Sequence, residues 1–321
     1  LVRRSVNPYL LSAIIRGRSR RTVMQATLRR SIFFHGVGVH SGAAARVAVR
    51  PAPRDHGIVF RRIDLADGDV VIPARWDRVV DTRLCTRLAN AAGVEVSTVE
   101  HLMAALSAMG VDNARVDVDG PEIPILDGSS APFVAAIRES GLAWEAAPRR
   151  ALRVLAPVSV EIGAARATLA PCDRFEIAFE IDFADAAIGR QRHALAVDAD
   201  SFAAELADCR TFARRADIEA LRAVGLARGG DLRNAVVVDG DRVLTPGGLR
   251  RPDEPVRHKI LDAVGDLALA GGPILGRYEG ARAGHGATNA LLRALFARPE
   301  AWRWETVIPS RAEIDAPLAA E

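Results

Sequence analysis

The sequence predicts an α+β protein with two domains. Its 321 residues are enough for two domains of roughly 150 residues each. In each half, several strand-like segments are followed by helical ones, which is the order typical of α+β folds. Hydrophobic residues make up 49% and charged residues 26% of the chain, as in globular proteins, and no apolar run approaches the ~20 residues of a membrane span.

The predicted domains are residues 24–147 and 151–305, the second following a linker at Trp144–Arg150, where a proline and two arginines occur. Residues 1–23 have no core pattern, and we interpret them as a disordered or non-native extension. A transit peptide is the alternative for such an arginine-rich segment without acids. Residues 306–321 are predicted to be a C-terminal tail.

Two helices are predicted in the first domain. Ser97–Met109 carries an apolar stripe at helical spacing and stops at Gly110, and Ser130–Ser140 closes the domain. Alternating segments predict the strands around these helices: Gln25–Phe34, Ala44–Val49, Gly57–Ile63, Asp69–Pro73 and Ala114–Val118.

Three helices are predicted in the second domain, at Asp217–Val224, Asp253–Ala270 and Ala287–Ala297. The longest of them is Asp253–Ala270, and it also carries the chemistry discussed below. The strands predicted around the helices are Arg153–Val160, Ala165–Ala170, Glu176–Ile181, Ala235–Val238 and Tyr278–Ala283.

The positive charge of the chain belongs to its N-terminus. Residues 1–30 contain eight arginines and no acid, so the net charge of +3 becomes −5 over the remaining 291 residues. The chain beyond residue 30 therefore gives no indication of nucleic-acid binding. Three widely spaced cysteines form no C-x-x-C motif or disulfide framework, which indicates a reducing cytosol.

Phe34–Gly42 is a glycine-rich turn that contains His35 and His40. Gly36 and Gly38 have the spacing of a phosphate cradle, although G-x-G alone is a weak signal. A plain hairpin connection between two strands explains the same glycines.

His258, Asp262 and Asp266 follow one another at intervals of four residues. At ~3.6 residues per turn, this spacing places all three on one face of a helix, while Ile260 and Leu261 face elsewhere. An imidazole and a carboxylate one turn apart can bind the same metal ion. The pattern therefore predicts two ligands of a metal site.

A catalytic zinc ion normally takes three protein ligands, so one more is required. Among the remaining histidines, His101 is the best candidate, because Glu100 beside it offers a general base. Two alternatives stay open here. Ser97-x-x-Glu100 is a capping box, which would explain Glu100 without catalysis, and a lone histidine on a helix is often structural.

The chain has 43 lysines and arginines, and only Lys259 is a lysine. It lies between His258 and Asp262. A compact ammonium differs from a planar guanidinium in shape and hydration, so this position can require lysine itself. Chance is the alternative, since some residue had to be the last lysine.

The chain from about Thr27 to Trp302 closely resembles the UDP-3-O-acyl-N-acetylglucosamine deacetylases, zinc amidases that commit Gram-negative bacteria to lipid A synthesis. The matching segments occur in the order of the family: HGVGVHSG (35–42), DTRLCT (81–86), STVEHLMAAL (97–106), DNARVDVDGPEIPILDGSSAPFV (112–134), RTF (210–212), VRHKILDAVGDLAL (256–269) and AGH (283–285). Together they are far more specific than a single H-x-x-x-D.

The resemblance implies a β-α-α-β sandwich: each domain is a β-sheet layered against two helices, and the helices pack together between the sheets. The site lies between the domains. A short βαβ insert in the second domain, at about 213–238, would form the passage for the acyl chain.

The resemblance also implies residue roles. One Zn²⁺ per chain would be held by His101, His258 and Asp262, with Glu100 as general base and His285 as second catalytic group. Asp266 would orient His285, Thr211 would place a hydroxyl near the oxyanion, and Lys259 would contact the nucleotide diphosphate. The remaining implied substrate contacts are Phe212, His40, Leu84, Ile218 and Leu226.

Three segments depart from the family pattern. Ala213 and Arg214 follow Phe212, so a charge stands where an aromatic residue is common. The family's GHALNN appears as Gly284–Asn289 with the letters GHGATN, and the loop Asp182–Ile188 lacks the usual His-Pro. None of these changes affects a predicted zinc ligand.

The expected function is hydrolysis of the N-acetyl group of UDP-3-O-acyl-N-acetylglucosamine by a cytoplasmic monomer, with transient contact to the inner-membrane surface. The alternatives are a zinc amidase for another N-acetylated sugar and a non-catalytic glycolipid-binding relative. Glu100 and His285 beside all three ligands argue against the non-catalytic alternative.

Overall fold

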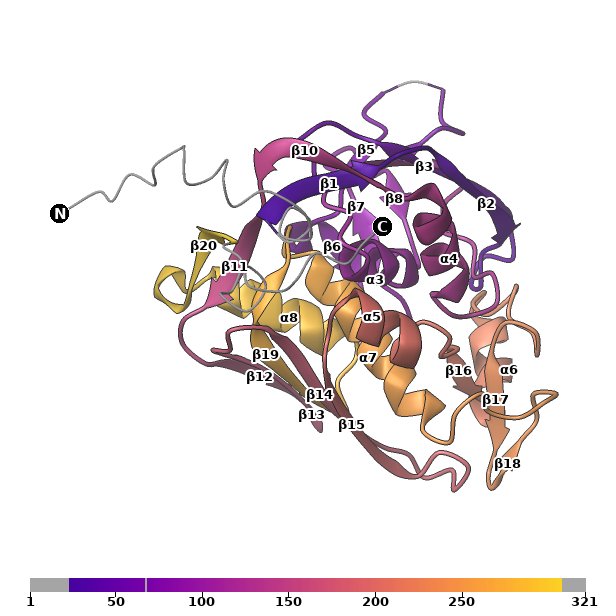
Figure 1. Cartoon of the computed structure of the whole chain (residues 1–321). Helices are drawn as coiled ribbons and strands as arrows, with labels where there is room; N and C mark the ends of the chain where they lie inside the picture. The colour runs from indigo at the N-terminus through magenta and orange to yellow at the C-terminus, as the bar shows by residue number, and fades with distance from the viewer. Residues whose placement is uncertain (1–22, 67, 308–321) are drawn as a thin grey trace, which may run out of the picture.

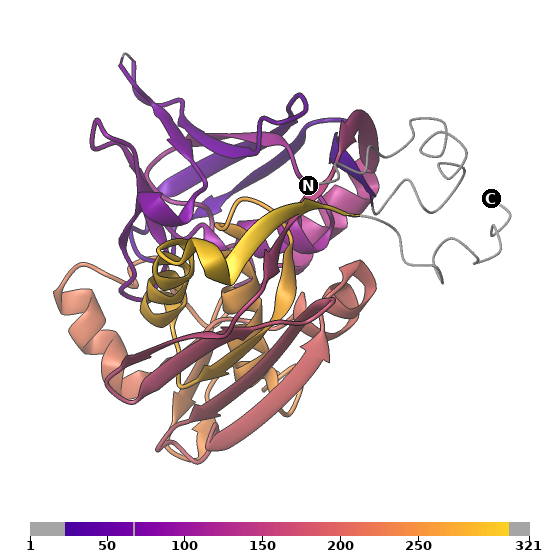
Figure 2. The same cartoon turned by 90° about the vertical axis from the view of Figure 1, so that its left-hand side faces the viewer.

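The computed structural model describes residues 23–66 and 68–307, and it places two sheet-rich regions on either side of a layer of helices (Figures 1 and 2). This arrangement confirms the predicted α+β fold with two domains. Of the extension 1–23 and the tail 306–321, only Val23, Thr306 and Val307 belong to the described residues. No helix in this part of the chain is long and apolar enough to cross a membrane.

The first-domain sheet has five strands in the order β2 (Ile32–Val37), β3 (Ala44–Pro51), β9 (Ala114–Asp119), β4 (Ile58–Arg62) and β5 (Val71–Pro73). β9 and β4 are parallel, and the other neighbours are antiparallel. The domain's other elements are the 3₁₀ turn η1 (Trp76–Arg78), the small sheet of β6 (Val79–Asp81), β7 (Arg87–Ala89) and β8 (Glu95–Val96), and the helices α3 (Glu100–Ala108) and α4 (Ala131–Ser140).

Two sequence predictions near the domain boundary are wrong. The predicted strand Gln25–Phe34 is two strands, because β1 (Met24–Leu28) pairs with β10 (Leu142–Pro148) while β2 pairs with β3. The predicted linker is also strand: only Arg149 separates β10 from β11 (Arg150–Val154), which joins the second sheet. The pairings of β1 with β10 and of β11 with its two neighbours join residues more than a hundred positions apart, so local periodicity does not reveal them.

The second-domain sheet follows the order β12 (Val158–Ile162), β13 (Ala165–Ala170), β19 (Ile274–Ala281), β11 and β20 (Trp302–Thr306). β14 (Phe175–Asp182) also pairs with β19, and β15 (Arg190–Ala196) pairs with β14. The single predicted strand Arg153–Val160 is therefore the end of β11 and the start of β12. The helical elements are α5 (Ala199–Ser201), a π-helical turn (Phe202–Leu206), α7 (Glu254–Ala268), α8 (His285–Phe296) and a 3₁₀ turn (Pro299–Ala301).

The helices α3 and α7 pack closely across the domain boundary. A Cβ atom at Gly265 would lie 2.0 Å from the backbone oxygen of Glu100, so a side chain there would force the two helices apart. Leu102 and Leu106 of α3 and Ile260 and Leu261 of α7 are fully buried. This contact brings the start of α3 beside the polar face of α7.

A separate βαβ unit projects beside the first domain. β16 (Phe212–Arg214) and β17 (Val236–Asp239) are parallel and joined through α6 (Arg215–Ala223), and β18 (Arg242–Val243) pairs with β17. α6 buries none of its side chains completely. The unit lies next to the β2 end of the first domain (Figure 1), where the N–H groups of Arg228 and Gly229 donate to the β2–β3 loop.

Candidate metal centre and active site

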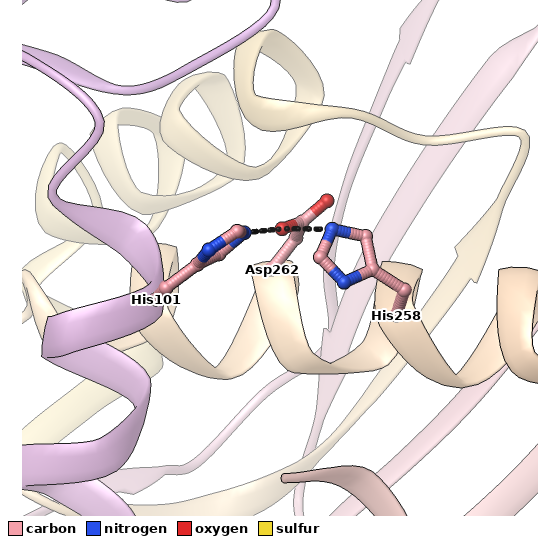
Figure 3. A group of neighbouring side chains, drawn as sticks. All are labelled: His101, His258 and Asp262. Atoms are coloured by element: carbon pink, nitrogen blue, oxygen red, sulfur yellow. Dashed lines mark ion pairs between the residues drawn. The ribbon is translucent and has the colours of Figure 1, made fainter. Parts of the chain in front are cut away.

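The side chains of His101, His258 and Asp262 meet at the crossing of α3 and α7 (Figure 3). One ligand atom from each lies within 4.8 Å of the other two, and all three residues are buried. Asp262 Oδ1 is 3.3 Å from His258 Nε2 and 3.5 Å from His101 Nε2. The structure therefore brings together the three residues that the sequence predicts as ligands.

The donors suit a divalent metal such as zinc. His258 Nδ1 lies 3.0 Å from the backbone oxygen of Cys209, and because a carbonyl only accepts, Nδ1 carries the proton and Nε2 offers its lone pair. Burial lowers the pKa of His258 to about 4, despite the nearby Asp262, so the ring is neutral at pH 7. Two imidazoles and one carboxylate leave a tetrahedral ion a fourth position for water.

Lys259 donates its ammonium to the second oxygen of Asp262, over 2.6 Å. Burial alone would raise the pKa of Asp262, but His258 and Lys259 outweigh it and lower this pKa well below its usual value. The carboxylate is therefore ionised and held in one orientation. The sequence predicted that Lys259 would lie beside the metal without contacting its ligands. Its flexible side chain instead reaches one turn along the helix to the proposed ligand Asp262.

Glu100 is almost completely buried and begins α3. The capping-box interpretation is wrong, because no side chain caps this helix and Ser97 Oγ donates to Pro121 instead. Thr98 has a φ of 57°, which keeps Ser97 outside the helical path. The Glu100 carboxylate accepts the backbone N–H of Thr86 over 3.0 Å, and burial raises its pKa, which His285 and His101 only partly offset.

His285 is the first residue of α8, and its Nδ1 lies 2.8 Å from Asp266 Oδ2. Burial opposes the charged ring, but Asp266 outweighs this effect and raises the pKa of His285 to about 9. The imidazole is therefore a cation at pH 7. This pairing has the geometry that the resemblance implied.

The predicted substrate contacts lie on several elements, and Phe212 is the one that packs against a proposed ligand. The Phe212 ring packs edge-on against His258, with centroids 6.3 Å apart, and its backbone begins β16 next to Thr211. Thr211 donates its N–H to Gly128 across the domains, and no hydrogen bond of its hydroxyl occurs within the described residues. Ile218 on α6 and Leu226 after it are half-buried in the βαβ unit.

His40 and Leu84 lie in first-domain loops, after β2 and after β6. His40 Nδ1 is buried and has no hydrogen-bond partner within the described chain. Leu84 has a φ of 69° and is 49% exposed. A Cβ at Gly38 would lie 2.1 Å from Glu122 Oε2, so this glycine makes room for a carboxylate. That close carboxylate disfavours the phosphate-cradle interpretation and favours a hairpin connection.

Sequence reasoning missed several residues that hold the site. Glu122 accepts the N–H groups of His40 and Ser41 and the hydroxyl of Thr98, and thereby ties the β2–β3 loop to the start of α3. Buried Glu254 binds Arg210 and fixes the chain just before Thr211. The available signal was their position inside or beside the matched motifs.

Two of the departures from the family pattern form a pair. Arg214 donates to Asp185 over 2.5 Å, which joins the βαβ unit to the loop Asp182–Ile188. The charge at Arg214 is therefore balanced by the loop that lacks the usual His-Pro.

A buried set of two histidines and one aspartate, with a carboxylate and a cationic imidazole beside it, is the arrangement of a metal-dependent hydrolase. The comparisons with known proteins agree. Residues 25–297 match the family model described as UDP-3-O-acyl N-acetylglycosamine deacetylase, and the chain belongs to this family. It is thereby a hydrolase of an amide bond.

Three relatives illustrate the similarity, and each carries the name UDP-3-O-acyl-N-acetylglucosamine deacetylase. The relative from Phenylobacterium zucineum is 56% identical over 291 residues, which is 91% of this chain and 99% of its own. That from Anaeromyxobacter sp. is 47% identical, covering 91% and 94%. That from Shewanella sp. strain W3-18-1 is 44% identical, covering 92% and 96%.

Proposed function

We propose that this chain hydrolyses the N-acetyl group of UDP-3-O-acyl-N-acetylglucosamine, releasing acetate and UDP-3-O-acyl-glucosamine for lipid A biosynthesis. The observation that carries the proposal is the buried cluster of His101, His258 and Asp262 with Glu100 and His285 beside it. Relatives named for this reaction match more than nine-tenths of the chain.

The three clustered residues would hold one zinc ion. When bound, zinc supplies Lewis-acid chemistry, in which it makes water a better nucleophile and polarises a carbonyl oxygen. His101 and neutral His258 would supply nitrogen lone pairs, and ionised Asp262 would supply negative charge. Lys259 and Cys209 keep Asp262 and His258 in place through their hydrogen bonds.

Glu100 is the base that accepts a proton from the attacking water. Its raised pKa makes it a better proton acceptor than an exposed glutamate, and the Thr86 N–H fixes its carboxylate. As the carbon–oxygen bond forms, negative charge develops on the amide oxygen. The Thr211 hydroxyl and the His285 cation stabilise this charge.

The carbon–nitrogen bond then breaks, and the amine leaves with a proton. Two donors are available for this step, protonated Glu100 and the His285 cation. Asp266 keeps His285 charged and oriented in either case.

The substrate would extend from this centre in two directions. Lys259 uses one of its three N–H donors on Asp262, and the others remain for the nucleotide diphosphate. The acyl chain would follow the βαβ unit. The residues proposed to contact the substrate elsewhere are His40, Leu84, Phe212, Ile218 and Leu226.

The protein would act in the cytoplasm as a monomer that touches the inner-membrane surface transiently. The proposed substrate supports the membrane contact, because its nucleotide is water-soluble and its acyl chain prefers lipid. No nucleic-acid partner is proposed, because the residues after position 30 carry a net charge of −5.

The decisive experiment is incubation of the purified chain with UDP-3-O-acyl-N-acetylglucosamine, with and without a metal chelator. We expect acetate and free amine to appear in equal amounts, to stop when the chelator removes the metal, and to return when zinc is added. A zinc-loaded, folded protein that releases no acetate would refute the proposal. Release from other N-acetylated sugars at equal rates would refute the choice of substrate.

A further inference from the structure

Thr86 binds two carboxylates that serve different parts of the candidate active site. Its backbone N–H donates to Glu100 Oε2 over 3.0 Å, and its hydroxyl donates to Asp266 Oδ1 over 2.5 Å. The side chain is 2% exposed, so water does not compete for these bonds. One residue therefore links the proposed base to the aspartate that holds His285.

This link crosses the domain boundary. Thr86 lies between β6 and β7 of the first domain, whereas Asp266 lies on α7 and His285 begins α8. Asp266 uses Oδ1 for Thr86 and Oδ2 for His285, whose Nδ1 is 2.8 Å away. Hydrogen bonds thus connect Glu100 to Thr86, Thr86 to Asp266, and Asp266 to His285.

The backbone before Thr86 is bent in a way that aims this residue inward. Leu84 has a φ of 69°, a conformation that non-glycine residues rarely adopt. The turn leaves Leu84 half-exposed and sends Thr86 into the interior. Such strained residues persist where the surrounding structure requires them, and they cluster at active sites.

The two bonds to Asp266 determine its orientation. The terminal torsion of aspartate has a broad energy minimum, so a carboxylate held through one oxygen can rotate. With Thr86 on one oxygen and His285 on the other, the carboxylate has a single orientation. Because Thr86 also holds Glu100, the separation between base and imidazole depends on this one residue.

We propose that Thr86 is a positioning residue that holds Glu100 and the Asp266–His285 pair at a fixed separation, so that proton uptake and proton donation meet at one substrate bond. The kinetic part of this inference rests on the function proposed above. A purely structural contact between the domains is the competing explanation.

The test is Thr86→Val, which keeps the shape and the backbone N–H and removes only the hydroxyl. Losing a hydrogen bond to a charged group predicts a kcat about 10- to 100-fold lower, with KM and zinc content unchanged. Thr86→Ser retains the hydroxyl and should recover most of the loss. The matched control is Thr27→Val, which removes a buried hydroxyl that donates to Asn113 outside the site.

A second readout follows the His285–Asp266 bond without substrate. The proton on His285 Nδ1 should give a downfield NMR resonance, assigned by its absence in His285→Gln. We expect Thr86→Val to shift or broaden this resonance, Thr86→Ser to restore it, and Thr27→Val to leave it unchanged. A structural contact alone would lower stability in both valine variants and leave the resonance in place.

The proposal is overturned if Thr86→Val keeps wild-type kcat and an unchanged resonance, or if Thr86→Ser is as impaired as Thr86→Val. An equal loss of kcat in Thr27→Val would also overturn it, because the effect would then follow from lost stability. The resonance is measured without substrate. A wild-type protein that releases no acetate therefore contradicts the proposed function and leaves the positioning test intact.

Discussion

His258 and His285 are both almost completely buried, and each faces an aspartate of α7, yet their pKa values move in opposite directions. Burial lowers the pKa of His258 to about 4, although Asp262 opposes it. Burial also lowers the pKa of His285, but Asp266 outweighs it and raises this value to about 9. The same pair of residue types thus gives a neutral ligand in one place and a cation in the other.

The difference lies in whether the aspartate also binds another cation. Asp262 faces His101 and His258 through one oxygen and binds the Lys259 ammonium through the other. Asp266 has His285 as its single ionic partner among the residues that the structure describes. A buried imidazole that shares its carboxylate with the Lys259 ammonium stays neutral and can bind metal, whereas one with its own carboxylate keeps its proton.

The largest effect is expected from removing the neutral histidine. His258→Ala deletes one of three proposed ligands, so zinc content should fall to background and acetate release should stop. The control is His56→Ala, a half-buried histidine whose Nδ1 contacts only Gly57 within the described chain. Zinc analysis and acetate release check both variants. A His258→Ala protein with full zinc content and normal acetate release would refute the assignment of His258 as a ligand.

Glu100 is close enough to His285 and His101 for both to lower its pKa, and we expect its charge to affect the reaction but not folding or zinc binding. Glu100→Gln keeps an oxygen that accepts the Thr86 N–H, so the variant should fold and bind zinc normally. Loss of the base should lower kcat by about 10²–10⁴-fold. The measurements are zinc content and acetate release. Near-normal turnover would show that this carboxylate has no role in proton transfer.

The helical part of this site was accessible to sequence reasoning because helices repeat locally. His258, Asp262 and Asp266 share a face through the four-residue spacing alone. His101 was the best candidate for the third ligand because Glu100 lies beside it, and the resemblance to the family then selected it. The buried positions of α7 were correct for the same reason, since Ile260 and Leu261 are fully buried.

What sequence reasoning missed depends on contacts between distant segments. The Thr86 hydroxyl reaches a carboxylate 180 positions away, and no local pattern records that distance. The capping-box prediction failed because Thr98 adopts a left-handed conformation, which a short motif does not reveal. Lys259 was placed by its direction at the helix surface, although a long flexible side chain can reach a carboxylate three residues on.

The contrast between the two aspartates can be tested through pH. His285 is a cation below its pKa of about 9 and loses its proton as the pH rises through that value, so kcat/KM should fall on the alkaline side. Asp266→Asn keeps hydrogen-bonding groups on both sides and removes the charge, while burial still lowers the pKa of the ring. The alkaline limb should therefore move to lower pH by about 1–3 units.

The matched control for this shift is Asp253→Asn, because Asp253 lies 3.5 Å from His193 outside the site. Its pH profile should coincide with that of the wild type. An alkaline limb that stays in place in Asp266→Asn would show that His285 does not determine it, and a limb that moves upward would contradict the sign of the argument.

The smallest effect is expected at Lys259, which binds the proposed ligand Asp262 and is also proposed to contact the substrate. Its ammonium is bound to Asp262, so Lys259→Ala should weaken zinc binding by about 10- to 100-fold, as for other residues that orient metal ligands. With saturating zinc the metal content should be normal, and KM should rise because a phosphate donor is lost. Lys259→Arg should restore charge and only part of the affinity, since a guanidinium is larger and planar.

Two substrates separate these roles of Lys259. KM should rise for the UDP-linked substrate and stay the same for an acylated N-acetylglucosamine without the diphosphate, while competition with a chelator reports zinc affinity. Arg257→Ala is the control, because Arg257 is the neighbouring cation on α7 and pairs with Asp253 and Glu205 instead of a metal ligand. Unchanged KM in both lysine variants would refute the diphosphate contact. Unchanged zinc affinity would show that Asp262 keeps its orientation without the ammonium.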